Sequence, residues 1–179
     1  ADSCLRRLTS SRRKLWPEGA GNNKWLLRSG IFFRRHGGSQ LPVGDDPAII
    51  VIDYYSDVLC VWAWIAQPRL EELHSQWGNR VAIRHRYLDV FGDSHGKIQR
   101  QWGQSDGFEK FAAHVAKSIA PFEQIAVHPD IWAATRPRSS LQAHMVLKAV
   151  EQVAGATFVA PTAQRIRQAF FTEARDIGD

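Results

Sequence analysis

Cys60 is the residue of this sequence whose type and position best suit covalent chemistry. It stands between a predicted strand and a predicted helix, in the segment S-D-V-L-C-V-W-A-W of residues 56–64. Unpaired backbone N–H groups and the helix dipole at a helix N-terminus favour a thiolate and lower the thiol pKa. A thiol at this point is a candidate nucleophile or redox centre. The alternative is a packing role, because free cysteines are among the most buried residues.

Asp57 lies three residues before Cys60 and has two alternative roles. A nearby carboxylate raises the pKa of a thiol and can accept its proton, so Asp57 could tune or deprotonate Cys60. It equally suits the capping of the turn that starts at Ser56. The seven His residues form no metal-binding pattern, and His114 and His144 are expected to be packing or surface residues. No metal site is predicted.

A strand–helix–strand unit must position this segment. Residues 48–54, with the sequence A-I-I-V-I-D-Y, are a β-branched run without helical period, which predicts a strand buried on both faces. Residues 62–76 follow a helical pattern that ends at Gly78, and residues 81–90 alternate as a second strand. Such a βαβ unit has parallel strands and a right-handed crossover. Cys60 is therefore expected at the carboxyl edge of the sheet, where open α/β sheets bind ligands.

Only helical signals follow the second strand. Residues 92–96 are predicted to form a loop, and apolar residues at helical spacing predict a helix over 108–119. A capping box that begins at Ser139 predicts a helix over 141–153, and Pro161 suits the first turn of a last helix. The expected fold class is α/β, with one βαβ unit of two strands and several helices.

The net charge of +5 is unevenly distributed along the chain. Residues 1–44 hold nine basic and two acidic residues, a net charge of +7, whereas the remainder holds fourteen basic and sixteen acidic residues. The pI of about 9.6 therefore belongs to the leading segment and does not indicate a nucleic-acid-binding domain. We expect residues 1–46 to be a basic, disordered leader or linker and residues 47–179 to be the folded domain.

The segment I-D-Y-Y-S-D-V-L-C-V-W-A-W-I-A-Q-P-R-L-E-E-L, residues 52–73, resembles the opening of the DsbA-like branch of the thioredoxin superfamily. It is most similar to the FrnE-type oxidoreductases, whose relatives include 2-hydroxychromene-2-carboxylate isomerases and kappa-class glutathione transferases. F-G-D at residues 91–93 and A-F-F-T-E-A-R-D-I-G-D at residues 169–179 agree with this resemblance. It implies a thioredoxin-like βαβ unit over 48–90 with an all-helical insertion over 97–179.

The resemblance implies roles for residues around the cysteine. Cys60 would be the catalytic thiol, and Asp57, Val61 and Trp62 would contact the substrate or glutathione. Val61 stands where the oxidoreductases commonly have Pro, and Ala63 stands where they have a second Cys. A dithiol enzyme needs that second thiol to pass on its disulfide or to escape a mixed disulfide. We therefore expect a monothiol site.

The sequence also ends early relative to this family. The family fold continues with a cis-Pro loop that faces the active site, two more strands and a final helix, and none of these follows Asp179. We therefore expect a domain that is incomplete at its C-terminus, with an exposed strand edge that favours dimerisation or aggregation. Cys4 could replace the missing second thiol only if the leader folded back onto the site, which we do not expect.

Three functions are consistent with these residues. The first is a thiol–disulfide oxidoreductase-like protein with a single nucleophilic Cys60. The second is a glutathione-dependent isomerase or transferase of the kappa type, and the third is a catalytically inert partial domain that acts by binding. The expected partners are a protein or a small thiol or disulfide, with glutathione as a co-substrate and no resident cofactor.

Location and assembly are less defined by the sequence. No apolar run approaches the roughly 18 residues of a membrane span, so none is predicted. A lone thiol stays reduced in the cytoplasm, which is the expected compartment. The oligomeric state is left open.

Overall fold

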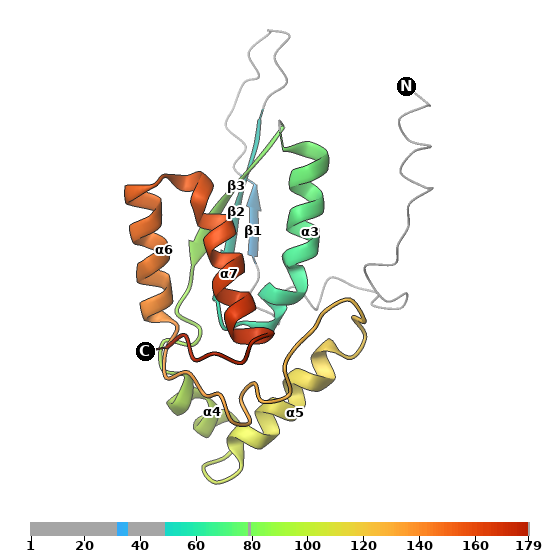
Figure 1. Cartoon of the computed structure of the whole chain (residues 1–179), viewed down its shortest axis with the longest axis vertical. Coiled ribbons are helices and arrows are strands. Elements are labelled where there is room, and N and C mark those ends of the chain that lie inside the picture. Colours follow the sequence, from blue (N-terminus) through green and yellow to red (C-terminus); the bar gives the residue numbers. More distant parts are fainter. Residues whose placement is uncertain (1–31, 36–48, 79, 179) are drawn as a thin grey trace, which may run out of the picture.

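The computed structural model describes residues 32–35, 49–78 and 80–178. Its sheet has three strands in the order β1-β2-β3 (Figure 1). The central strand is β2, Ile50–Ser56, which pairs in parallel with β3, Val81–Tyr87. On its other side β2 pairs antiparallel with the short strand β1, Phe32–Arg35. The sheet therefore has one strand more than the two that the sequence predicted.

The predicted βαβ unit is confirmed. Helix α3, Val61–Trp77, connects β2 to the parallel strand β3, and all three elements lie close to their predicted bounds. Leu70 of the helix packs against Tyr54 of β2, because the helical period brings its apolar residues onto the sheet. This arrangement places the carboxyl ends of β2 and β3 and the N-terminus of α3 at the same edge.

Strand β1 lies inside the basic segment that was expected to be a leader. It pairs with residues 52–55 of β2 and covers that edge of the central strand over those positions. The four residues F-F-R-R carried no turn signal or alternation that would have predicted a strand. The rest of the leader, with the expected disorder and Cys4, lies outside the described residues.

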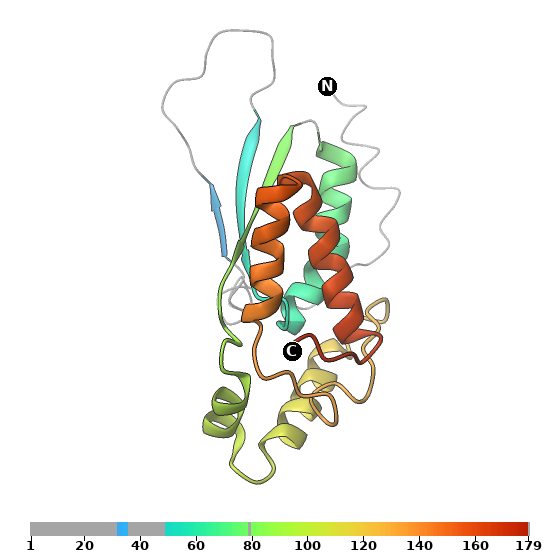
Figure 2. The same ribbon diagram turned by 60° about the vertical axis from the view of Figure 1, so that its left-hand side comes forward.

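Four helices and one 3-10 turn follow β3 within the described part of the chain. They are α4, Ser94–Trp102; α5, Gly107–Ile119; α6, Leu141–Val153; the turn Ala156–Phe158; and α7, Val159–Phe171. Figures 1 and 2 show α4 and α5 beyond the carboxyl ends of β2 and β3, whereas α6 and α7 run beside the sheet. The predicted bounds of α6 are confirmed, and Pro161 lies in the first turn of α7.

Helix α4 corrects the prediction of a loop over residues 92–96. It begins at Ser94, and the side chain of Asp93 caps it by accepting a hydrogen bond from the backbone N–H of Gly96 at 2.9 Å. The polar, glycine-containing sequence of residues 92–96 favoured a loop, but the Asp93 cap stabilises the start of a helix there.

The start of α6 corrects the predicted capping box. The N-cap residue is Ser140, and its side chain makes no capping hydrogen bond. Instead, the Ser139 hydroxyl accepts a hydrogen bond from the backbone N–H of Leu141 at 3.0 Å. The Ser140 hydroxyl is therefore available for a contact elsewhere in the fold, described below.

The main core lies between α3 and the helical region. Trp132, Phe170 and Phe171 are fully buried, and the Trp132 and Phe91 rings stack with centroids 5.4 Å apart. Trp64 of α3 stacks on Phe171 of α7 with centroids 5.8 Å apart, which joins these two helices. Aromatic packing against α7 thus supports the N-terminal turn of α3. No helix among the described residues has the length and apolar character needed to cross a membrane.

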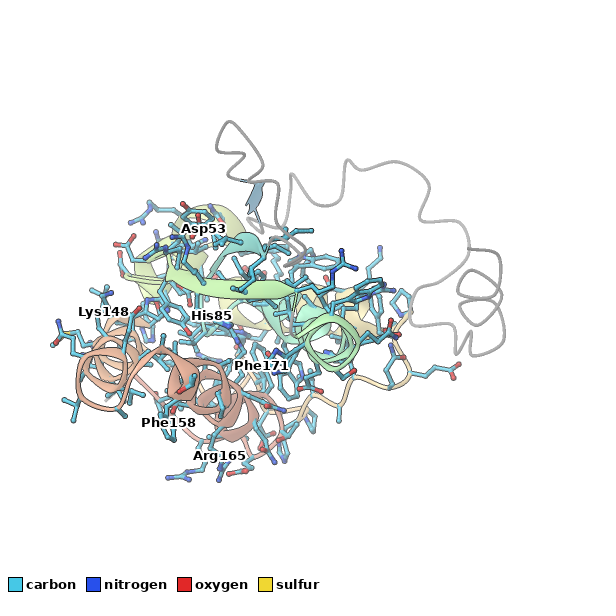
Figure 3. All side chains as sticks on the ribbon, turned by 90° about the horizontal axis from the view of Figure 1, so that it is seen from above. Asp53, His85, Lys148, Phe158, Arg165 and Phe171 are labelled. Carbon is cyan, nitrogen blue, oxygen red and sulfur yellow. The ribbon has the colours of Figure 1, made fainter. Side chains whose placement is uncertain are left out.

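The two faces of the sheet differ in what covers them. Figure 3 shows His85 pointing toward α6 and α7, and Asp53 pointing to the opposite side. Tyr54 is opposite His85 in the parallel register, so both belong to the covered face, which we call the helix face. Asp53 is opposite Arg84 on the other face, which we call the outer face.

Candidate functional site

The turn between β2 and α3 places Cys60 where the sequence predicted it. Cys60 is the N-cap residue of α3, with an extended backbone (φ −79°, ψ 117°). Its carbonyl accepts hydrogen bonds from the N–H groups of Ala63 at 3.0 Å and Trp64 at 3.2 Å, and its own N–H donates to Asp57 O at 3.2 Å. Cys60 is present as a thiol and is partly buried against the main core.

The charge state of the thiol differs from the expectation. Burial raises the pKa of Cys60, and this effect exceeds the lowering by hydrogen bonds from the backbone N–H groups of Ala63 and Trp62. The charge of Asp57 raises the pKa further, and the charge of Arg167 lowers it. The expected depression of the pKa is therefore wrong, because the helix N-terminus does not outweigh the loss of solvent.

Asp57 has the capping role that was one of its two alternatives. Its carboxylate is buried and accepts hydrogen bonds from the backbone N–H groups of Leu59 at 2.8 Å and Phe91 at 2.9 Å. The Ser140 hydroxyl donates a third hydrogen bond at 2.8 Å. The carboxylate therefore ties the thiol turn to the segment after β3 and to the start of α6.

His144 completes this connection from α6. Its Nε2 accepts a hydrogen bond from the backbone N–H of Val58 at 3.3 Å and lies 3.8 Å from Asp57 Oδ1. Its ring stacks on Tyr87 with centroids 5.1 Å apart. Burial lowers the pKa of His144, so the ring is neutral and Nε2 acts as the acceptor. The expected packing role of His144 agrees with these contacts.

Arg167 is the residue near the site that sequence reasoning missed. Its guanidinium projects from α7 and is fully buried. Nη2 donates to Ser56 Oγ at 3.0 Å, Nη1 donates to Gln67 Oε1 at 3.4 Å, and Nε has no hydrogen-bond partner among the described residues. The one available signal was its position four residues after Ala163 and three before Phe170, on the buried stripe of α7.

The other predicted contact residues have different surroundings. The Val61 side chain is buried in the main core, whereas Trp62 is partly buried and packs beside Tyr54. Ala63, which stands where relatives have a second cysteine, is fully buried. Of the predicted contact residues, Trp62 therefore keeps part of its side chain accessible beside Cys60.

Lys97 of α4 adds a second cation near the thiol. Its Nζ lies 4.5 Å from the centroid of the Phe91 ring and donates to the Val90 carbonyl at 2.9 Å. Burial lowers the pKa of Lys97, while the charges of Cys60 and Asp57 raise it. Because those charges act on Lys97, the ammonium belongs to the electrostatic surroundings of the thiol.

A groove of about 580 Å³ lies between β3 and α6, on a different part of the surface from the thiol. Tyr87, His144 and Met145 are among its lining residues, and Cys60 is not. The buried side-chain atoms Tyr87 Oη and His85 Nδ1 have no hydrogen-bond partner among the described residues. Both atoms are inaccessible to solvent, although the Tyr87 and His85 residues line the groove.

A parallel βαβ unit with a cysteine at the N-terminus of its helix, followed by a helical region, defines a thioredoxin-like α/β protein. Residues 51–179 match the family model of the DSBA-like thioredoxin domain. This match covers most of the chain, and the chain belongs to that family. The resemblance of the Cys60 segment to the DsbA-like branch of the thioredoxin superfamily is therefore confirmed.

Solved structures show the same fold. A Nitrosomonas europaea protein assigned as a protein disulfide isomerase is 14% identical with a TM-score of 0.55, over 72% of this chain and 58% of that chain. The cytosolic disulfide reductase DsbM from Pseudomonas aeruginosa, in a structure with GSH, is 21% identical with a TM-score of 0.53, over 72% and 59%. The chain thus spans somewhat less than two thirds of the length of these proteins. A comparison with curated proteins gave no match.

Proposed function

We propose that this chain takes part in thiol–disulfide exchange as a monothiol, with Cys60 as the nucleophile. The observation that carries the proposal is the position of Cys60 at the N-cap of α3, where the backbone N–H groups of Trp62 and Ala63 act to lower the pKa of its thiol. These donors stabilise negative charge on sulfur, which is what a thiol needs in order to attack a disulfide.

The proposed reaction has two steps. The Cys60 thiolate attacks one sulfur of a disulfide, forms a mixed disulfide and releases the other sulfur as a thiolate. A second thiol, for which we propose glutathione, then attacks the mixed disulfide and releases the Cys60 thiolate. Cys60 is unchanged over the cycle, and the disulfide of the first partner has become one free thiolate and a mixed disulfide with glutathione. An external thiol is required because Ala63 cannot attack the mixed disulfide.

The buried surroundings of Cys60 make the reaction strongly dependent on pH. Burial raises the pKa of the thiol, so a minor fraction is ionised at neutral pH. We expect the rate of attack to rise with pH until the pH exceeds this raised pKa. Asp57 opposes ionisation through its charge, and Arg167 favours it.

Two further parts of the proposal concern the ligand and the compartment. Glutathione is proposed because a structural relative was solved with GSH and is described as a cytosolic disulfide reductase. The same description supports the cytoplasm as the proposed compartment.

Trp62, partly exposed beside Cys60, is the proposed contact for the partner that carries the disulfide, and the Val61 and Asp57 backbones would flank it.

The test uses the full chain with Cys4→Ala, so that Cys60 is its one remaining cysteine. The protein is incubated with glutathione disulfide across a range of pH, and the intact mass is measured before and after addition of reduced glutathione. We expect one glutathione adduct that forms faster at higher pH and is removed by the reduced thiol, with Cys60→Ser as the unreactive control. A protein that binds glutathione without forming the adduct would instead support the kappa-type isomerase or transferase. A protein that does neither would support the inert domain.

A further inference from the structure

Arg167 is a buried cation whose partners do not balance its charge. Ion-pair partners are absent for it among the described residues, since its two hydrogen-bond acceptors are the neutral groups Ser56 Oγ and Gln67 Oε1. Burying a charge is costly unless an opposite charge lies close by. A fully buried guanidinium with neutral partners and a third nitrogen without a partner therefore requires an explanation.

The two hydrogen bonds hold the guanidinium beside the side of helix α3 that begins at Cys60. Ser56 lies four residues before Cys60, at the end of β2, and Gln67 lies seven residues after it. Positions i and i+7 of a helix are on the same face, so Gln67 is two turns along from Cys60 on one side of α3. The guanidinium thus spans the strand end and the second helical turn, with the thiol turn between them.

The carboxylates of the fold do not supply the missing negative charge. Asp57 already accepts three hydrogen bonds, from Leu59, Phe91 and Ser140. Asp53 is on the outer face of the sheet, where it is bound by arginines. Neither carboxylate lies within ion-pair distance of Arg167.

Four other titratable groups feel the charge of Arg167, and all are neutral near pH 7. Burial raises the pKa of Tyr54 and raises that of Tyr87 to about 12, so neither forms a phenolate. Burial also lowers the pKa of His144 and lowers that of His85 to about 4, so neither carries a proton that would repel the guanidinium. Among the described residues, Cys60 is the other group that feels the charge of Arg167, and its thiol can ionise to an anion.

We propose that Arg167 is a positioning residue for Cys60, and that its buried positive charge stabilises the thiolate that the exchange reaction requires. This inference rests on the proposed function and names a group that favours its first step. Arg167 acts through the electrostatic field and touches neither the substrate nor the reacting sulfur.

The energetics give the proposal a distinctive signature. Burial of a charge without an opposite charge close by is costly, and even a buried ion pair can often be replaced by apolar side chains of similar volume without loss of stability. A residue kept for reactivity should therefore reduce stability, whereas a residue kept for structure should increase it. We expect Arg167→Met to unfold at the same temperature as the parent or at a higher one.

The experiment compares substitutions in the Cys4→Ala background. The rate of alkylation of Cys60 by iodoacetamide is measured as a function of pH for Arg167→Met, Arg167→Gln and Arg167→Lys. The matched control is Arg165→Met, since Arg165 is an exposed arginine of the same helix, paired with Glu173. Thermal unfolding is recorded for every variant.

The two neutral variants should move the midpoint of the pH profile upward, and the rate at a fixed pH below the midpoint should fall by roughly threefold to tenfold. Arg167→Lys should keep most of the parent behaviour, and Arg165→Met all of it. If Arg167→Met does not fold, Arg167→Gln, which keeps a hydrogen-bonding side chain, gives the same readout.

Unchanged pH profiles in a folded neutral variant would overturn the inference, even if the parent forms the glutathione adduct and the proposed function stands. A shifted profile in a protein that never forms the adduct would support the inference and refute the proposed function.

Discussion

The two faces of the sheet differ in whether their buried charge has a partner of opposite charge. On the outer face, the buried carboxylate of Asp53 accepts hydrogen bonds from Arg84 Nε and Nη2, both at 2.9 Å, and from Arg86 Nε at 3.2 Å. On the helix face, the buried guanidinium of Arg167 has neutral partners and no carboxylate within ion-pair distance among the described residues. Figure 3 shows Asp53 on the side of the sheet that faces away from α6 and α7.

This difference separates a structural charge from a reactive one. Hydrogen bonds from Arg84 are the largest of the influences that lower the pKa of Asp53, so the ion pairs keep the carboxylate charged and in place. On the helix face, the described residues provide no such ion pair for Arg167, and the Cys60 thiol is a group there whose ionisation its charge favours. Charge balance on the outer face keeps the Asp53 carboxylate in place, and in our proposal the unbalanced charge on the helix face serves the reactivity of Cys60.

The largest expected effect concerns Asp57, which belongs to the helix face but is fully hydrogen-bonded. Asp57→Ala leaves two backbone N–H groups and one hydroxyl without acceptors, so we expect the free energy of unfolding to fall by about 3–5 kcal/mol. Urea denaturation measures this loss. Asp57→Asn is the control, because its amide oxygen still accepts part of these hydrogen bonds, and it should cost about half as much. A loss below about 1 kcal/mol for the alanine variant would contradict the capping role.

The next effect is the response of the helix face to mild acid through His85. Its pKa is lowered by burial from 6.5 to about 4, so in this window the unfolded chain binds a proton that the folded chain does not. Stability is therefore present above pH 6.5 and is lost as the pH falls toward 4, by on the order of 3 kcal/mol. Between pH 7 and pH 4.5, the urea midpoint of the parent should fall, and that of His85→Phe should fall less. Parallel losses in the two proteins would exclude His85 as the source.

The outer face should respond at a lower pH. The pKa of Asp53 is lowered below 3.8, so its contribution is present above that value and is lost as the pH falls through the lower, folded value. We expect Asp53→Asn to be less stable than the parent at pH 7 and equal to it in strong acid. A stability difference that persists at pH 2 would show that packing, and not charge pairing, sets the contribution of this residue.

The smallest effect distinguishes the two arginines of the outer face. Arg84 binds the Asp53 carboxylate through two nitrogens and Arg86 through one, and both side chains are partly exposed. We expect Arg84→Ala to lower stability more than Arg86→Ala, with both losses below about 1 kcal/mol. The reverse order in chemical denaturation would mean that the bidentate geometry does not govern the pairing.

Some elements of the fold could be predicted from the sequence because their signals are local. The β-branched run of β2 and the helical periodicity of α3 and α5 each predict one regular element, and the structure has all three near their predicted bounds. Strand β1 and helix α4 lacked such signals. A strand of four residues depends on its partner strand, and the start of α4 depends on a single aspartate cap.

The site was predictable in position but not in charge. Cys60 was placed correctly, because a thiol between a strand and a helix must lie at the helix N-terminus. The direction of its pKa was predicted wrongly, because burial by distant segments is not visible in the local sequence. Arg167 was missed for the same reason: an arginine on a helix is expected to be exposed, and its burial follows from how α7 packs against α3.

The hydrogen bonds of Asp57 also have a consequence for the order of folding. Its partners Phe91 and Ser140 are 34 and 83 residues away along the chain, so the turn before α3 can be completed only after α6 has docked. Contacts between distant residues form slowly, since a long loop must close first. We therefore expect Cys60 to be alkylated at the rate of an unfolded chain through most of refolding and at the slower rate of the native thiol only in its last phase, which stopped-flow mixing followed by an alkylation pulse would reveal. The Cys60 thiol would then acquire its native reactivity only when α6 docks and folding is complete.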